Sequence, residues 1–586
     1  MSLLLVSLGT TPDQSTEDPQ IARALKGAGI QGFQDAREFT WFGGRAWWFK
    51  MQVNSLGSGA SIRIDDRFAA YVGSVHWQSL TGEALLARLL EDFDEPAKMP
   101  LHEFSGAFAM LFHSHGGIWL FNDAVGIQKI YETDDDRIIS TSLFVCRATL
   151  KSPTVNRLRA QEYVLLGGNH GLQTAVSGVR IADPTMAREL GSATTRILHF
   201  PAAWRIPCPF RKSREAVEAL SSMLIADFES MADAFGSNIG MALSGGFDSR
   251  LLLAGLDRVG IQPRLYVYGA ARDDDVSVAT AVAARLGMSI ETIDKSLVNA
   301  ARPKLGRRTL SLNLAFFDGL PADGVFDRGA DQLTRMQQVE GGRLNLNGGG
   351  GEIFRNFFYL RDRLFTAGDL VGAFYSNWLP GAIASFDERV NFLETIEDSV
   401  LECLGYTSGT AGERATKISR NEVELVYSLL RLRYWMGRNN TVAARYGAFI
   451  TPLALPTIVA LAASLPLAWK EFGALEASLI RAVSTRVAGG PSSYGFEFSA
   501  GPNIAHKLRV STTLYRPLPI RRRSAQLRRI LGKAPPVDLS DEWRDAAGFP
   551  AEVDWIDVRF LTEADQLNRL MSLKSFLSDD LCGLNQ

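Results

Sequence analysis

The fold of the second half of the chain is decided by the stretch MALSGGFDSRLLLAG, which runs from Met241 to Gly255. Its apolar start, up to Leu243, predicts a buried strand, and the Leu/Ala run from Ser249 predicts a helix. Two glycines between them allow a tight turn whose backbone N–H groups point outward, beside the positive end of the helix dipole. A turn of this kind at the carboxyl end of a parallel strand is typical of phosphate binding.

The small and polar residues of this turn predict a nucleotide site. A Cβ at the glycines would keep a phosphate away from the backbone amides, so their smallness suits an anion. The residues expected to hold phosphate are Ser244, Gly245, Gly246 and Ser249. Asp248 cannot attract phosphate by its own charge, and we therefore expect it to hold a Mg²⁺ ion that bridges to the phosphates.

Helices and strands alternate around this stretch. The periodicity predicts helices over 215–234, 249–259 and 275–286, with strands over 238–243 and 264–268. Alternation of this kind indicates a doubly wound parallel sheet. Beyond about residue 370 the pattern is mostly helical.

The first 200 residues read differently, as short strands with few helices between them. Strands are predicted at 2–7, 46–53, 61–64, 69–72, 107–112, 117–121 and 137–140. Such closely spaced strands suggest sheets packed on each other. The proline-rich, non-periodic run around 200–211 is the predicted linker. The chain is therefore divided into a domain at 1–200, a linker at 201–212, a nucleotide-binding domain at 213–515 and a C-terminal extension at 516–586.

Composition excludes several classes of protein. The 586 residues carry 62 basic and 64 acidic side chains, a net charge of −2, which gives no global attraction to nucleic acid or to a membrane surface. The four cysteines, Cys146, Cys208, Cys403 and Cys582, form no CxxC pair and no zinc spacing. No apolar run reaches the length of a membrane span, and the start lacks the features of a signal peptide. We expect a cytoplasmic protein with no membrane or nucleic-acid partner.

Several motifs together resemble one family. The SGGFDS turn resembles the pyrophosphate loop of the ATP pyrophosphatase superfamily. Three further stretches resemble the asparagine synthetase domain of that superfamily, namely VYGAARDDDVSVATAVAARLGM (Val267–Met288), LNLNGGGGEIF (Leu344–Phe354) and RYWMGRNNTVAARYGAFITPLALPTIVALAASLP (Arg433–Pro466). His102–Cys146 looks like the glutaminase half of the same family. The chain is thus similar to asparagine synthetases over roughly residues 100–480.

The resemblance implies a fold, an activity and a set of site residues. The fold is α/β, with a glutaminase-like N-terminal sandwich and a doubly wound ATP-pyrophosphatase domain. The activity is an ATP- and Mg²⁺-dependent ligation in which a carboxylate is adenylated, pyrophosphate leaves, and an amine displaces AMP. Adenine is expected to contact the strand end at Val267, Tyr268 and Gly269, and the second glycine loop to contribute Gly349 and Gly350. Glu352 is the expected catalytic acid and, with Asp248, the expected metal ligand.

The sequence departs from the family at three places. It begins Met1-Ser2 where the glutaminase needs an N-terminal Cys, so we expect no hydrolysis of glutamine. Gly348 and Gly351 stand where the second loop usually has acids. The family also has a lysine that neutralises the developing oxyanion, but Gly489–Pro502, where that lysine is expected, contains none. β-Lactam synthetases and lasso-peptide macrolactam synthetases share the loss of the Cys and use an internal amine.

These departures leave alternatives open. The substrate carboxylate is a small molecule or a peptide, the acceptor is an amine or free ammonia as in an ammonia-dependent asparagine synthase, and a partner protein could deliver a peptide. A sugar or polysaccharide precursor is a further option. A non-catalytic scaffold that kept the fold is the rival from another class, and an adenylating enzyme of the tRNA or NAD type is a second enzymatic rival.

A few charged residues have two interpretations each. Asp273–Asp275 is a metal cluster or a solvated helix start. Arg355 reaches a phosphate or carboxylate, or forms a surface salt bridge. Arg438 and Arg445 face the nucleotide or substrate, or pack at the edge of the core. Arg521–Arg529 holds an acidic peptide or nucleic acid, or forms a solvated helix face.

Overall fold

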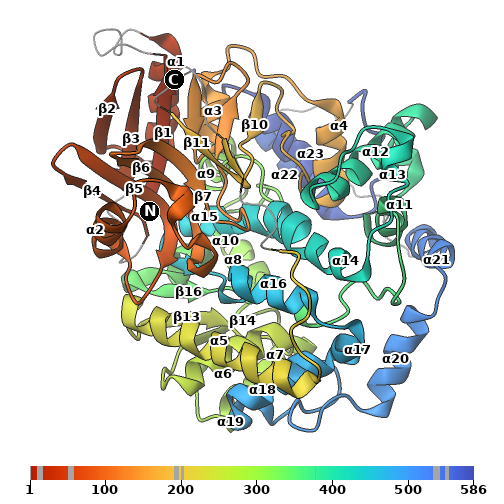
Figure 1. The fold of residues 1–586 in the computed structure, drawn as a ribbon. Helices are drawn as coiled ribbons and strands as arrows, with labels where there is room; N and C mark the ends of the chain where they lie inside the picture. Colours follow the sequence, from red (N-terminus) through yellow and green to blue (C-terminus); the bar gives the residue numbers. More distant parts are fainter. Residues whose placement is uncertain are drawn as a thin grey trace.

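The computed structural model describes residues 2–9, 18–50, 58–190, 197–199, 204–375, 378–531, 541–547 and 553–585. It is a mixed α/β structure, as predicted, with two antiparallel six-stranded sheets, one parallel five-stranded sheet and many helices. In Figure 1 the antiparallel sheets, coloured red to orange, lie above strands 239–242, 264–268 and 344–346 of the parallel sheet, coloured yellow to green.

The antiparallel sheets pack face to face in the first half of the chain. The first sheet has the order β10-β8-β9-β1-β3-β2 and the second β12-β11-β7-β6-β5-β4. Their bounds are β1 (Ser2–Leu8), β2 (Ala36–Trp41), β3 (Gly44–Lys50), β4 (Ala60–Ile64), β5 (Arg67–His76), β6 (Ser105–Ser114), β7 (Gly117–Asn122), β8 (Tyr131–Thr133), β9 (Ile138–Ser140), β10 (Val179–Ile181), β11 (Met186–Glu189) and β12 (Ile197–His199). Every strand expected from the sequence is present, although 51–53, the end of one of them, falls outside the described residues.

The central strands are apolar throughout because both of their faces are buried. In β1, Leu4 and Val6 face the second sheet, whereas Leu3 and Leu5 belong to the core formed with the first helix. The helices that cover the outer faces are α1 (Pro19–Ile30), α2 (Gly82–Asp92), α3 (Leu143–Thr149) and α4 (Arg157–Leu166). The sequence pattern did not place these helices, and they turn the expected packed sheets into a layered α/β sandwich.

The parallel sheet has the strand order β15-β14-β13-β16-β17. Its elements are α5 (Ser213–Phe235), β13 (Ile239–Ala242), α6 (Phe247–Arg258), β14 (Arg264–Tyr268), α7 (Asp274–Arg285), β15 (Ile290–Ile293), β16 (Leu344–Leu346) and β17 (Phe449–Ile450). The chain moves outward from β13 to β15 on one side and from β16 to β17 on the other. The order therefore reverses between β13 and β16, and that switch point is where doubly wound sheets bind ligands.

The rest of the chain is mainly helical, as predicted. The helices are α8 (Lys295–Ala300), α9 (Arg307–Phe316), α10 (Ala330–Gln338), α11 (Ala367–Leu370), α12 (Phe386–Cys403), α13 (Ala411–Arg414), α14 (Arg420–Val426), α15 (Gly437–Ala444), α16 (Pro456–Ser464), α17 (Leu467–Lys470), α18 (Ala474–Val483), α19 (Thr485–Ala488), α20 (Ile504–Leu514), α21 (Leu518–Leu531), α22 (Asp541–Ala547) and α23 (Ala564–Leu577). Two segments, η6 (Val371–Tyr375) and η8 (Tyr427–Met436), are π-helical.

No single helix among the described residues has the length and apolar character needed to cross a membrane; the bent combination of Pro456–Ser464 with Leu467–Val483 meets that criterion only as a pair. The end of the chain returns to the first half. The backbone oxygen of Leu584 accepts a hydrogen bond from Lys26 at 2.8 Å, and Figure 1 shows the C-terminus beside α1.

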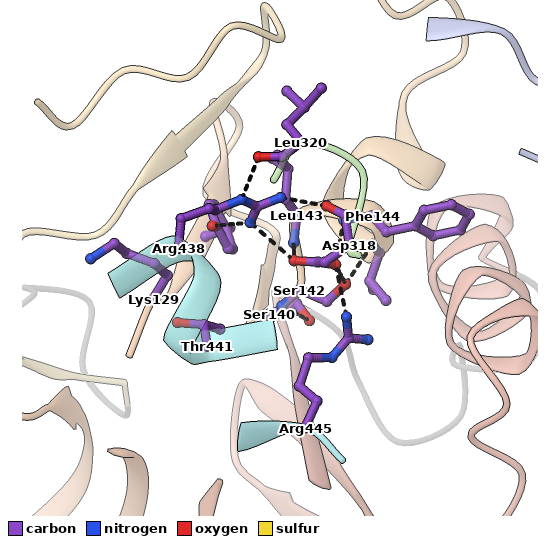
Figure 2. A network of polar contacts seen from close by, with 12 residues as sticks. Lys129, Ser140, Ser142, Leu143, Phe144, Asp318, Leu320, Arg438, Thr441 and Arg445 are labelled. Carbon is purple, nitrogen blue, oxygen red and sulfur yellow. Dashed lines mark hydrogen bonds and ion pairs between the residues drawn. The ribbon is translucent and has the colours of Figure 1, made fainter. Parts of the chain in front are cut away.

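A buried carboxylate, Asp318, joins the two halves of the molecule (Figure 2). From the first half it accepts hydrogen bonds from the side chains of Gln31 and Ser142 and from the backbone N–H groups of Leu143 and Phe144. From the second half, Arg438 approaches it at 3.2 Å and Arg445 at 3.5 Å. The Asp318 side chain is fully buried, so these donors replace the water that an ion needs.

The two arginines serve this buried ion and not a nucleotide. Arg438 also donates to the backbone oxygens of Leu320 and Asp318, at 3.0 and 2.5 Å. Burial alone would raise the pKa of the Asp318 carboxyl, but the charges of Arg445 and Arg438 outweigh burial and hold the pKa below its usual value. Of the two interpretations of Arg438 and Arg445, packing within the core is the one that the structure bears out.

We predict that Asp318→Asn lowers the free energy of unfolding by about 3 kcal/mol or more, because it leaves two buried guanidinium groups without their counterion. A group with a depressed pKa stabilises the fold above its unfolded pKa and loses that contribution as the pH falls. The difference between wild type and variant should therefore be full at neutral pH and shrink below about pH 4. Urea unfolding at several pH values measures it.

Asp65→Asn is the matched control for this substitution. Asp65 has φ 55° and Asp318 has φ 57°, so both substitutions place Asn in the same left-handed conformation. Asp65 is exposed, and its replacement should change the stability by less than about 0.5 kcal/mol. Equal unfolding midpoints for the two variants would contradict the role given to Asp318.

Candidate functional site

The first glycine loop connects β13 to α6 at the switch point of the parallel sheet. The residues predicted to hold phosphate lie here together, and they are partly bonded to one another. The Ser244 amide donates to the Ser249 hydroxyl at 3.1 Å, and the Gly246 amide donates to the Ser244 hydroxyl at 3.2 Å. No side chain caps the N-terminus of α6, so the amides of its first turn remain available to an anion.

The second glycine loop follows β16 and packs directly on the first. A Cβ added to Gly348 would lie 3.2 Å from the Cβ of Asp248, and one added to Gly351 would lie 2.2 Å from an Asp248 carboxylate oxygen. Gly349 and Gly350 line the same loop, and the φ of +100° at Gly350 favours glycine. The two loops therefore face each other. A side chain at 351 would displace the Asp248 carboxylate, whereas one at 348 would need only a small shift of the first turn of α6.

A segment near residue 490 forms a third wall of the site. The buried guanidinium of Arg250 donates to the backbone oxygens of Val487, Gly489 and Pro491 at 3.1, 3.2 and 2.7 Å, which fixes this segment beside α6. The Ser493 amide then donates to the Gly245 oxygen at 3.0 Å. The contacts of this segment with the first loop do not follow from the sequence pattern, in which the segment is distinguished only by its lack of a lysine.

One of the loop amides is already occupied by an acid. The Asp275 carboxylate accepts from the Gly245 amide at 3.3 Å and from the Ser493 hydroxyl at 2.7 Å. Of the two interpretations of Asp273–Asp275, the helix start is the one observed, since Asp273 is the N-cap residue of α7 and Asp274 and Asp275 lie in its first turn. Asp275 nevertheless reaches across to the phosphate loop.

The residues expected to contact adenine lie at the end of the neighbouring strand, β14. Val267 is buried, and the Gly269 amide donates to the backbone oxygen of Ile293 at 3.1 Å. The Tyr268 ring lies 4.5 Å from the Lys295 ammonium, and burial raises the pKa of Tyr268 to about 12. These three residues stand beside the first loop, and their contact with adenine stays a prediction.

A cluster of charges lies next to the loops, with Arg355 at its centre. Arg355 donates through two nitrogens to both oxygens of Asp248, at 2.6 and 3.0 Å, and to Glu476 at 2.6 Å. Glu352 is 3.7 Å away. Arg355 thus forms a salt bridge, but not the surface salt bridge that the sequence suggested. The bridge is largely buried, since the Arg355 side chain is 18% exposed and Glu476 is fully buried.

Glu352, the expected catalytic acid, is bonded to a tyrosine. The Tyr427 hydroxyl donates to Glu352 at 2.5 Å. Burial and the charge of Asp248 raise the pKa of Glu352, while the Glu352 carboxylate and burial raise the pKa of Tyr427. Burial raises the pKa of Glu476 well above its usual value, and the proximity of Asp248 adds to this effect.

The predicted Mg²⁺ site does not fit this arrangement. Both oxygens of Asp248 accept from Arg355, and one oxygen of Glu352 accepts from Tyr427. Within the described ranges, no three His, Cys, Asp or Glu side chains are arranged to hold a metal ion. Lys470 does not serve the loops either, because it is buried against Glu424 at 3.0 Å.

Three of the site residues were not predicted: Glu476, Tyr427 and Ser493. A weak signal for Glu476 exists in the sequence, because it shares one helical face with Leu479, Ile480 and Val483. A lone acid on an apolar face of this kind needs a partner, and that requirement points toward a buried cation.

We predict that the stability of Glu476→Gln relative to the wild type increases as the pH rises from about 4 to about 8, because burial raises the pKa of the Glu476 carboxyl in the folded protein. A carboxyl whose folded pKa is raised contributes stability below its unfolded pKa and loses that contribution as the pH rises through the folded pKa. Thermal unfolding midpoints across this range measure the trend.

Glu497→Gln is the control for this comparison, because Glu497 is exposed. Its difference from the wild type should not vary with pH. A flat difference for Glu476→Gln as well, or one that falls as the pH rises, would contradict the raised pKa of Glu476.

No protein-family model matches the chain, and no curated protein matches it either. Among solved structures, part of the chain is similar to glutamine phosphoribosylpyrophosphate amidotransferase from B. subtilis, complexed with ADP and GMP, at 10% identity and a TM-score of 0.22. The match covers 50% of this chain and 65% of the amidotransferase, less than two thirds of its length. A similarity of this extent assigns neither an activity nor a ligand.

Proposed function

We propose that the chain binds ATP at the two facing glycine loops and uses it to activate a carboxylate for attack by an amine. The observation that carries the proposal is the position of the loops: both follow parallel strands at the point where the strand order reverses. The uncapped first turn of α6 supplies amides and partial positive charge for phosphate oxygens.

The proposed reaction has two displacements. A carboxylate oxygen of the substrate attacks the α-phosphorus of ATP, the bond from that phosphorus to the bridging oxygen breaks, and pyrophosphate leaves with the bridging oxygen. The amine nitrogen then attacks the acyl carbon, AMP leaves, and one amine proton passes to a base. Adenylation is required because a free carboxylate is a poor electrophile at neutral pH. Glu352, held by Tyr427 beside the loops, is the residue we propose for the base.

A cavity of about 670 Å³ offers a substrate site that is separated from the loops by Tyr427 and Glu352, since no residue of either glycine loop lines it. Phe357 lines it, and its ring lies 4.8 Å from the ring of Tyr427, which bonds Glu352. Arg431 also lines the cavity and stacks on Trp435 and Phe374 at 4.4 and 4.9 Å. Within the described residues Arg431 has no ion-pair partner, so its guanidinium suits a substrate carboxylate. A volume of this size fits a molecule larger than a free amino acid.

Nitrogen is proposed to come from an amine or ammonia and not from glutamine. Ser2, which stands where the family has its nucleophile region, is buried in β1 opposite Lys50. A second candidate function is a binding protein without catalysis. The charge cluster around Arg355 favours it, because the part of the chain that the structure describes shows no cation site beside the phosphate loop.

Gly246→Ala tests nucleotide binding. Gly246 has ordinary extended backbone, φ −86° and ψ 175°, and an added Cβ would meet only the Ser244 hydroxyl, at 3.3 Å. The variant should fold, but its methyl group would stand at the mouth of the phosphate loop. We expect ATP affinity to fall by about tenfold or more, which corresponds to about 1.4 kcal/mol. Calorimetric titration, with and without Mg²⁺, measures it.

Gly306→Ala is the matched control. Gly306 is also the N-cap residue of a helix, with φ −119° and ψ 172°, and an added Cβ there meets nothing within 4 Å. The free energy of unfolding should therefore fall by a similar amount in both variants, about 1 kcal/mol or less. Only Gly246→Ala should lose affinity for ATP. Absence of ATP binding by the wild type at about 1 mM would refute the proposal. Binding without pyrophosphate exchange for any carboxylate in a broad panel would favour the non-catalytic candidate.

A further inference from the structure

Three acidic side chains converge beside the phosphate loop from separate parts of the chain. Asp248 comes from the first turn of α6, Glu352 from the turn η5 (Gly351–Phe354), and Glu476 from α18. Carboxylate oxygens next to a phosphate site are the ligands that Mg²⁺ prefers, but with Arg355 between them these three acids are not arranged to hold an ion. The space between them is filled by the Arg355 guanidinium.

The guanidinium makes the contacts that a cation would make. One η nitrogen lies 2.6 Å from Asp248 and 2.6 Å from Glu476, and the other lies 3.0 Å from the second Asp248 oxygen. Bidentate pairing of this kind fixes the carboxylate in the plane of the guanidinium. The Arg355 guanidinium also lies 5.8 Å from the ring of Phe247, which packs it against α6.

The second glycine loop makes this pairing possible. A Cβ at position 351 would lie 2.2 Å from the Asp248 oxygen that Arg355 bonds, so only glycine leaves the carboxylate free to turn toward the arginine. Arg355 follows directly after the turn that carries Glu352, and its position is set by the same short segment. The glycine and the arginine therefore act together.

We propose that Arg355 replaces the divalent cation at this site, so that phosphate groups bind at the loop without Mg²⁺. The positive charge belongs to the protein, is always present and does not leave with pyrophosphate. The consequence for ATP rests on the proposed nucleotide binding. The structural part of the inference, that Arg355 fills the position of the cation, does not depend on nucleotide binding.

The first test uses Mn²⁺ as the probe and needs no nucleotide. Arg355→Met removes the guanidinium and leaves Asp248, Glu352 and Glu476 facing one space. We expect the wild type not to bind Mn²⁺ at this cluster and the variant to bind it at least about tenfold more tightly, as measured by electron paramagnetic resonance of free Mn²⁺. Arg328→Met is the control, because Arg328 pairs bidentately with a single acid, Glu542.

Arg355→Met leaves one fully buried acid, Glu476, and two partly buried acids, Asp248 and Glu352, without their counterion, so a second variant is needed in case this one does not fold. In the double variant Arg355→Met, Glu476→Gln, the fully buried acid is neutral while Asp248 and Glu352 remain as ligands. A folded double variant that binds Mn²⁺ more tightly than the wild type supports the inference. Equal Mn²⁺ affinity in the wild type and the folded variants overturns it.

The second test compares ATP affinity in EDTA and in Mg²⁺. We expect the wild-type values to agree within about threefold, and Arg355→Met to bind ATP only when Mg²⁺ is present. A wild type that needs Mg²⁺ for a gain of about tenfold or more overturns the inference and keeps the proposed function. A wild type that binds no ATP under either condition overturns the proposed function, and the Mn²⁺ experiment then decides the inference alone.

Discussion

The architecture depends on one buried charge, the carboxylate of Asp318. An ion at full burial is tolerable only when donors replace its hydration, and here the donors come from both halves of the chain. Ser142 and Phe144 begin α3 of the sandwich, whereas Arg438 lies in α15 of the second half. If the halves separated, Asp318 would lose the donors from the first half that replace its hydration. The relative position of the halves is therefore fixed by electrostatics as well as by apolar packing.

This constraint reaches the candidate site through one continuous helical segment. η8 begins at Tyr427 and passes directly into α15, which carries Arg438. The sandwich also holds the middle of the segment, since the Arg433 side chain donates to the backbone oxygen of Val125 at 2.6 Å and Lys129 donates to that of Arg433 at 2.5 Å. Because the middle of the segment and its α15 end are fixed in this way, the sandwich supports the position in which the Tyr427 hydroxyl meets Glu352. The sandwich also contributes Leu165 and Leu166 to the lining of the proposed substrate cavity.

Sequence patterns predicted the parts of this structure that depend on local order. The strand 239–242, the turn after it and the helix from 247 follow from apolar runs and glycines within fifteen residues of one another. The contacts of Asp248 could not be predicted in the same way, because its partners Arg355 and Glu476 are 107 and more than 200 positions away. The same holds for Arg438, whose partner Asp318 is 120 positions distant. Spacing along a helix shows which side chains share a face, but it does not show what that face meets.

The glycines of the two loops are needed for different physical reasons, and the difference bears on function. A Cβ at Gly245 would lie 1.8 Å from the Ser493 hydroxyl, and one at Gly349 would lie 1.9 Å from the sulfur of Met436. A Cβ at either position would force a neighbouring side chain to move, so packing by itself favours glycine there, whether or not a nucleotide binds. Gly246 is different, because an added Cβ there has room and an allowed backbone conformation. The folded protein does not itself require glycine at 246, and this residue lies at the uncapped N-terminus of α6. Its smallness is therefore best explained by a ligand. Gly246 is the residue that distinguishes a nucleotide-binding loop from a loop kept small by its neighbours.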